Sequence, residues 1–89
     1  MTYKVFISKE AEIELATAEY YFKARNPHRD FLNDFNRQLE FLENTPESFQ
    51  KNYKEIRMLN FNQFNYSIHY VISGDKVLLL RILNQRQNF

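Results

Sequence analysis

Residues 64–72 read FNYSIHYVI, and this alternation decides the fold class of the chain. One face of the predicted strand carries Phe64, Tyr66, Ile68, Tyr70 and Ile72. The residues between them include Ser67 and His69, so the period is two, which is typical of a β-strand with one buried face. A turn at Ser73-Gly74-Asp75 leads into residues 76–83, whose nearly continuous apolar run predicts a central strand covered on both faces.

Residues 53–59 precede this pair of strands and alternate in the same way. Ile56 and Met58 fall on one face of the predicted strand, and Glu55 and Arg57 fall on the other. On the strand faces turned away from the aromatic core we expect Arg57, Ser67 and His69. The three consecutive strands can form a meander, because short turn segments separate them.

The first half of the chain has the period of helices instead. After a short alternating strand at residues 3–7, a helix over about 9–25 is predicted by the stripe Ala11, Leu15, Ala18 and Phe22. Ser8 provides a hydroxyl group for its N-cap. A second helix can begin at Asn26-Pro27 and end near Asn44, before the Thr45-Pro46 pair. Its apolar stripe consists of Leu32, Phe35, Leu39 and Leu42.

The predicted order is therefore β-α-α-β-β-β, which is an α+β fold. We expect a two-helix hairpin packed on one face of a mostly antiparallel four-stranded sheet. The first strand must join an edge of this sheet or pair beside the last strand. With 89 residues the chain has the length of one domain, which we assign to residues 1–89.

Composition excludes several classes of protein. The chain has no cysteine, which removes disulfide scaffolds, cysteine nucleophiles and Cys-ligated zinc or iron–sulfur sites. Its one glycine, Gly74, is too few for the glycine-rich phosphate loops of nucleotide-binding proteins. The longest apolar run, residues 77–80, is far shorter than the ~20 residues of a membrane span. We therefore expect no cofactor, no bound metal and no membrane partner.

The net charge of +1 hides a division of charge near Pro46. Residues 1–48 carry six basic and nine acidic side chains, a net −3, whereas residues 49–89 carry six basic and two acidic side chains, a net +4. The predicted helical half is thus acidic and the predicted sheet half is basic. A positive sheet face suits a polyanion or an acidic protein segment, although a small domain can also use basic side chains simply to solvate one face.

Three co-linear segments resemble the RelE/ParE superfamily of bacterial toxins from type II toxin–antitoxin modules. One is the strand-to-helix entry at residues 6–12, which read FISKEAE. Another is the arginine-bearing strand around Arg57 with the following strand at residues 64–70, and the last is the final strand with its terminal Arg86. The resemblance covers nearly the whole chain and is closer to the ParE branch, often labelled plasmid-stabilisation proteins, than to the RelE branch.

This resemblance implies a cytoplasmic toxin that a cognate antitoxin holds silent. ParE-like toxins poison DNA gyrase by binding it and need no catalytic residues of their own, whereas RelE-like toxins cleave mRNA in the ribosome. Here no histidine stands at residues 83–85, where family members often carry one or two, and the chain ends in Phe89, which has no titratable group. These departures favour gyrase as the target. A ribosome-dependent mRNA endonuclease and a non-toxic antitoxin-binding module remain the alternatives.

The candidate site residues come from the basic half of the chain. For target binding we expect Lys51, Lys54, Arg57, Arg81 and Arg86. If the chain is instead a nuclease, the three arginines would stabilise the charge on the reacting phosphate. The acid–base candidates would then be His69 and Glu55, although Glu55 can also serve as the cross-strand partner of a basic residue.

The partner is expected to be a cognate antitoxin. Antitoxin tails are commonly acidic within this superfamily, and the basic half of the chain would attract one. The candidate apolar anchors are Phe6, Phe61 and Phe89. The other expected partners are DNA gyrase or, in the alternative, the ribosome and mRNA, and either a homodimer or a toxin–antitoxin hetero-oligomer can form.

Overall fold

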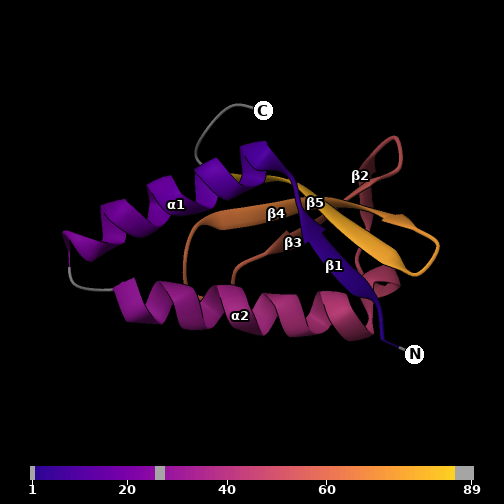
Figure 1. Cartoon of the computed structure of the whole chain (residues 1–89), viewed down its shortest axis with the longest axis horizontal. Helices are drawn as coiled ribbons and strands as arrows, with labels where there is room; N and C mark the ends of the chain where they lie inside the picture. The colour runs from indigo at the N-terminus through magenta and orange to yellow at the C-terminus, as the bar shows by residue number, and fades with distance from the viewer. Residues whose placement is uncertain (1, 26–27, 86–89) are drawn as a thin grey trace.

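The computed structural model describes residues 2–25 and 28–85. In chain order the elements are β1 (Lys4–Ile7), α1 (Lys9–Lys23), α2 (His28–Asn44), a short 3₁₀-helix η1 (Pro46–Ser48), β2 (Lys51–Tyr53), β3 (Ile56–Asn60), β4 (Tyr66–Ser73) and β5 (Lys76–Asn84). Figure 1 shows α1 and α2 running antiparallel beside the sheet. The predicted α+β class, with a helical hairpin packed on the sheet, is confirmed.

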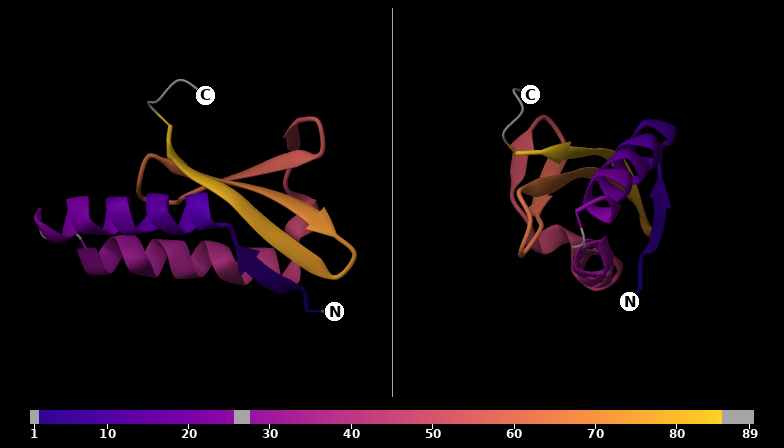
Figure 2. Two further views of the ribbon diagram at one scale, coloured as in Figure 1. Left: turned by 45° about the horizontal axis from the view of Figure 1, so that its top comes forward. Right: turned by 90° about the vertical axis from the view of Figure 1, so that its left-hand side faces the viewer.

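The strands form one mixed sheet in the order β1-β5-β4-β3-β2. β1 pairs with β5 in parallel, and the other neighbouring pairs are antiparallel. β3, β4 and β5 form the predicted meander, and β1 lies at an edge beside the last strand, as predicted. The two views of Figure 2 show the twisted sheet curving around the helical hairpin.

The predicted count of four strands is wrong, because the sheet already has five strands within residues 2–25 and 28–85. Residues 53–59 do not form one strand. Lys54 has a φ of 49°, in the left-handed region, and with Glu55 it turns the chain between β2 and β3. Across this tight hairpin Tyr53 pairs with Ile56. The alternation of side chains concealed the turn, because it contains neither glycine nor proline.

The helix ends follow from local chemistry. The Ser8 hydroxyl accepts a hydrogen bond from the backbone N–H of Ala11 at 3.1 Å, which confirms the predicted N-cap of α1. α1 ends at Lys23, slightly before the predicted end, and α2 ends at Asn44 as predicted. The predicted start of α2 at Asn26-Pro27 falls outside the described residues. No helix in the described part of the chain is long and apolar enough to span a membrane.

The core lies between the helical hairpin and the sheet. Both predicted helical stripes contribute to it, and its buried side chains include Ala11, Ala18, Phe31, Phe35, Leu42, Ile68, Tyr70, Val77 and Leu79. The Phe31 ring lies 4.8 Å from the Phe22 ring and 5.4 Å from the rings of Phe61 and Phe64, between centroids. The prediction that Phe61 is an exposed anchor is therefore wrong, because its ring stacks on Phe31 in the core.

Tyr70 is fully buried at the centre of β4, and its hydroxyl donates a 2.6 Å hydrogen bond to the carbonyl oxygen of Pro46. Burial raises the pKa of Tyr70 to about 12. We expect Tyr70→Phe to lower the free energy of unfolding by about 1–2 kcal/mol, because the Pro46 carbonyl loses its buried donor. Urea denaturation measures the change. Tyr20→Phe is the matched control, since Tyr20 is 78% exposed and its variant should unfold like the wild type; equal stability of the two variants would contradict the role assigned to Tyr70.

Candidate functional site

Arg57 projects toward the helix side of the sheet, so its predicted face is wrong. Its partner on β4 is Tyr70, and directly opposed residues of antiparallel strands share a face. Leu59 is the residue of β3 that enters the core. Because residues two apart on a strand share a face, Arg57 points to the same side as Leu59. The Arg57 Nη1 donates to the carbonyl oxygens of Phe49 at 2.7 Å and of Glu47 at 3.3 Å. The guanidinium group thus ties β3 to the segment that joins η1 and β2.

Ser67 and His69 lie on the predicted face, away from the helices, but the expectation that this face is open around them is wrong. Their exposed fractions are 0% and 1%. Met58 and Arg81 flank His69 from the two neighbouring strands, and the Tyr53 hydroxyl lies 3.4 Å from the His69 Nδ1. A general base must contact the group whose proton it removes, so a histidine this deeply covered does not reach a substrate in this structure.

Burial lowers the pKa of His69 below its ordinary 6.5, and the charge of Arg81 lowers it further, while Glu14 opposes the shift. At mildly acid pH, His69 therefore binds a proton more readily in the unfolded chain than in the folded chain. The stability that neutral His69 provides is present above 6.5 and is lost as the pH falls through the lowered folded value.

We therefore expect the wild type to lose more stability than His69→Gln when the pH is lowered from about 7.5 to about 5.5. Urea midpoints at the two pH values, measured for both proteins, give the difference directly. The carboxylates contribute equally to both proteins, so they cancel. Parallel pH profiles for the wild type and the variant would show that His69 is not held neutral.

Arg81 shares the face of His69, and it is already paired. Its Nε and Nη2 donate to the Glu14 Oε2 at 2.9 and 2.6 Å. The same carboxylate accepts the backbone N–H of Ile82 at 2.9 Å through Oε1. The two hydrogen bonds to one carboxylate oxygen fix the orientation of the Arg81 guanidinium group, and the negative charge of Glu14 offsets its positive charge.

The start of α1 closes the edge of β5 beyond the end of β1. β1 pairs with β5 only as far as Leu79. From there the Ser8 N–H donates to the carbonyl of Leu79 at 2.9 Å, and the Ser8 hydroxyl donates to the carbonyl of Leu80 at 2.8 Å. Glu14 then receives the Ile82 N–H, as described above. This half of the β5 edge is therefore blocked to another strand, whereas β1 has no strand on its outer side among the residues that the structure describes.

The β2–β3 hairpin keeps its basic side chains on the surface. Lys51 and Lys54 are both exposed, and Lys51 Nζ forms a 2.8 Å ion pair with the Glu55 Oε2. That ion pair lowers the pKa of Glu55. Of the other predicted residues, Arg86 and Phe89 lie outside the described residues.

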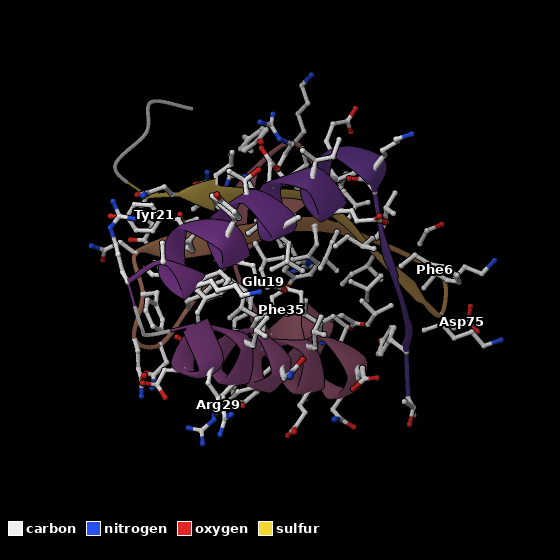
Figure 3. All side chains as sticks on the ribbon, turned by 60° about the vertical axis from the view of Figure 1, so that its left-hand side comes forward. Phe6, Glu19, Tyr21, Arg29, Phe35 and Asp75 are labelled. Carbon is white, nitrogen blue, oxygen red and sulfur yellow. The ribbon has the colours of Figure 1, made fainter. Side chains whose placement is uncertain are left out.

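A groove that the sequence did not reveal opens between β1, the first half of α1 and α2. Its volume is about 500 Å³, and most of its lining is apolar. The lining consists of Val5, Phe6, Ile7, Glu12, Leu15, Phe35, Asn36, Leu39, Glu43 and Leu79. Its charged side chains are both acidic. Phe35, which belongs to this lining, lies between the two helices in Figure 3.

The other face of β1 carries a second exposed apolar row. Phe6 stands beside Leu78, with exposed fractions of 50% and 37%, and Leu78 stands beside Val71 on β4. Figure 3 shows Phe6 on the far side of β1 from the helices. At the end of this row, Lys4 stands beside Lys76, and both are exposed. The sequence contained one sign of this row, because Phe6 places an apolar side chain on the face of the first strand opposite Val5 and Ile7.

In the described part of the chain, no group of three or more histidine, aspartate or glutamate side chains is arranged to hold a metal ion. The two exposed surfaces described above each combine an apolar row with charged residues at its ends.

Comparison with known proteins identifies relatives of this architecture. The family model described as the ParE toxin of type II toxin–antitoxin system, parDE, matches residues 5–89. Among solved structures, a chain of the chromosomal ParDE TA system from P. aeruginosa superposes with a TM-score of 0.76 at 15% sequence identity. The match covers 93% of this chain and 96% of that chain, and at this identity it shows a shared fold. No curated protein sequence matches the chain.

Proposed function

The chain belongs to the ParE toxin family of type II toxin–antitoxin systems, and from this membership we propose that it is the toxin of such a module. In this proposal it inhibits growth by binding DNA gyrase, and a cognate antitoxin neutralises it. The observation that carries the proposal is the family match over residues 5–89, which includes every strand and helix except the first residue of β1.

The placement of the basic residues supports a toxin that acts by binding. Arg57 is bound to two carbonyl oxygens, and Arg81 is paired with Glu14. His69 is covered and has a lowered pKa. A nuclease needs an acid–base pair and cations that reach the phosphate together. Among the described residues, Arg57 and Arg81 are bound to other groups of the protein and His69 is buried. This arrangement favours gyrase binding over the RelE-like alternative.

For target binding we propose the exposed β2–β3 hairpin, together with Arg86. In this hairpin Lys54 lies at the turn, and Lys51, which is ion-paired with Glu55, lies at the start of β2. The two lysines stand on an exposed hairpin at the edge of the sheet opposite β1. The antitoxin is proposed to use the β1 edge. The two partners would then approach from opposite edges of the sheet.

Induced expression in bacteria tests the proposal. We expect growth to stop, DNA double-strand breaks to appear and plasmid supercoiling to be blocked, and we expect co-expression of the antitoxin to restore growth. Cleavage of ribosome-bound mRNA without DNA breaks would support the nuclease instead. Continued growth with abundant soluble protein would support a module that only binds antitoxin.

Lys54 allows the target surface to be tested without loss of stability. Its φ of 49° is strained for a lysine and natural for glycine, so Lys54→Gly should be at least as stable as the wild type. We expect Lys54→Gly to inhibit growth less strongly, because the basic charge is removed. Lys54→Arg is the control that keeps the charge, and it should inhibit growth like the wild type. If both variants arrest growth equally, Lys54 does not contact the target.

A further inference from the structure

We propose that the outer face of α1 binds the same face of a second copy of the chain, with the two helices antiparallel. The outer face of α1 is formed by Ile13, Ala16, Thr17 and Tyr20, all of which are exposed. This inference goes beyond the proposed function, because it concerns the chain by itself and needs neither an antitoxin nor a target.

α1 carries apolar side chains on two opposite sides. One side carries Ala11 and Ala18, which are buried in the core. The other side carries Ile13 and Tyr20, with exposed fractions of 57% and 78%. Residues seven apart lie two turns apart on one face of a helix, so Ile13 and Tyr20 belong to one row. α1 packs against β5 and α2 and lies at the border of the molecule (Figure 1), so this row faces away from the core and suits a partner outside the chain.

The outer face of α1 has small residues in its middle and large residues at its ends. Ala16 and Thr17 lie between Ile13 and Tyr20 along the helix. If two antiparallel copies cross at Ala16 and Thr17, Tyr20 of each copy lies beside Ile13 of the other, because both are equally far from the crossing point. The small side chains at the crossing let the helix axes approach closely, and each Tyr20 ring then covers an Ile13 side chain. The face is therefore complementary to itself.

The charges at the two ends of α1 favour an antiparallel pair. The exposed charged side chains of the first turn are Lys9, Glu10 and Glu12, one basic and two acidic. At the other end Lys23 lies in the last turn and Arg25 follows it, both basic and both exposed. In an antiparallel pair each first turn lies beside the basic end of the other copy, so opposite charges meet at both ends of the contact. A parallel pair would bring the two basic ends together.

The outer face of α1 is separate from the groove beside β1, whose lining takes Glu12 and Leu15 from this helix. With 15 residues α1 is about 22 Å long. Two helices of this length make a contact smaller than the ~1,200 Å² at which stable interfaces begin. We therefore expect a weak dimer, with a dissociation constant on the order of 100 μM.

Sedimentation equilibrium of the purified chain, without antitoxin, measures this constant. We expect Ile13→Glu to weaken self-association at least about tenfold, because the dimer would bury a charge beside Tyr20 of the other copy. Tyr20→Ala should also weaken it, by loss of the ring alone. Phe6→Glu is the matched control, since Phe6 is 50% exposed on a different surface and its variant should associate like the wild type.

Three results of this measurement would overturn the inference. One is a wild type that stays monomeric at about 1 mM, ten times the expected constant. Another is an Ile13→Glu variant and a Tyr20→Ala variant that both associate like the wild type. The last is an equal loss of self-association in Phe6→Glu, which would place the contact on the outer row of β1 instead.

Single-cysteine variants test the orientation of the two helices, because the chain has no cysteine of its own. Thr17→Cys places a thiol at the crossing point, close to the same thiol of the other copy. Ala24→Cys places it at the basic end, where the two copies of residue 24 lie about 22 Å apart along an antiparallel pair, too far for a disulfide. Under mild oxidation we expect Thr17→Cys to form a disulfide-linked dimer and Ala24→Cys to remain mostly unlinked. Linkage of Ala24→Cys as fast as that of Thr17→Cys would contradict the antiparallel pair.

Discussion

Asp34→Ala is expected to lower the free energy of unfolding by about 3 kcal/mol, a large share of the stability of a domain this small. Asp34 is 5% exposed on α2. Its Oδ1 accepts hydrogen bonds from the Asn62 N–H at 3.0 Å and the Gln38 side-chain amide at 2.9 Å. Its Oδ2 accepts the Gln63 N–H at 2.7 Å. Alanine would leave these donors without their acceptor and release the β3–β4 loop from α2.

Two further variants define the cause of this loss. Asp34→Asn keeps one oxygen but places an N–H₂ group against a backbone N–H, so its loss of stability should lie between the wild type and alanine. Asp30→Ala is the matched control, because Asp30 is exposed on the same helix and should change stability by less than about 0.5 kcal/mol. Chemical denaturation measures all three. If Asp34→Ala unfolds at the same urea concentration as Asp30→Ala, the carboxylate does not hold the loop.

Glu14→Ala is expected to lower the free energy of unfolding by about 2 kcal/mol. The Glu14 carboxylate both receives the Ile82 N–H and pairs with Arg81, so alanine removes an acceptor from the strand edge and a partner from a cation. Glu14→Gln keeps an acceptor for Ile82 and should lose about 1 kcal/mol. Denaturant unfolding of the purified variants gives both values.

Glu12→Ala is the control for Glu14, since Glu12 lies in the first turn of the same helix and is exposed. Its effect should stay near 0.5 kcal/mol, the contribution of an acidic side chain to a helix N-terminus. A Glu14→Ala variant as stable as Glu12→Ala would mean that the β5 edge needs no cover from α1. Glu14→Ala that also associates into larger species would support the view that this cover protects the edge.

The periodicity of the sequence was sufficient to predict the class of fold and the core. The change from a helical to a strand period after Pro46 reflects which side chains are buried, and burial is what the pattern records. The helical stripes and the Tyr66–Ile68–Tyr70 face of β4 accordingly lie where they were expected. The fifth strand was missed because Lys54 turns the chain in a left-handed conformation that lysine rarely adopts.

The candidate site was harder to predict, because alternation assigns two faces without saying which one meets the helices. Arg57 shares a face with Tyr70 since Leu59, rather than Ile56 or Met58, enters the core. His69 was assigned to the correct face, but its burial depends on side chains from three other strands. The β1 groove depends on how two helices and a strand meet, and no local pattern of sequence records that arrangement.

The acidic and basic halves of the chain place their charged side chains at different parts of the structure. The acidic first half supplies Glu14, which occupies Arg81, and it supplies Glu12 and Glu43, which line the groove. The basic second half keeps Lys51 and Lys54 on an exposed hairpin at the far edge of the sheet. The surfaces proposed above for the antitoxin and for the target therefore belong to opposite edges of the sheet.

Supercoiling by purified DNA gyrase is the measurement that tests the proposed activity most directly. Relaxed plasmid, gyrase and ATP would be incubated with the purified chain, with and without its antitoxin. We expect the chain to block supercoiling and to cause cleaved plasmid to accumulate, and we expect the antitoxin to restore the reaction. Unchanged supercoiling at a molar excess of folded chain would contradict gyrase as the target.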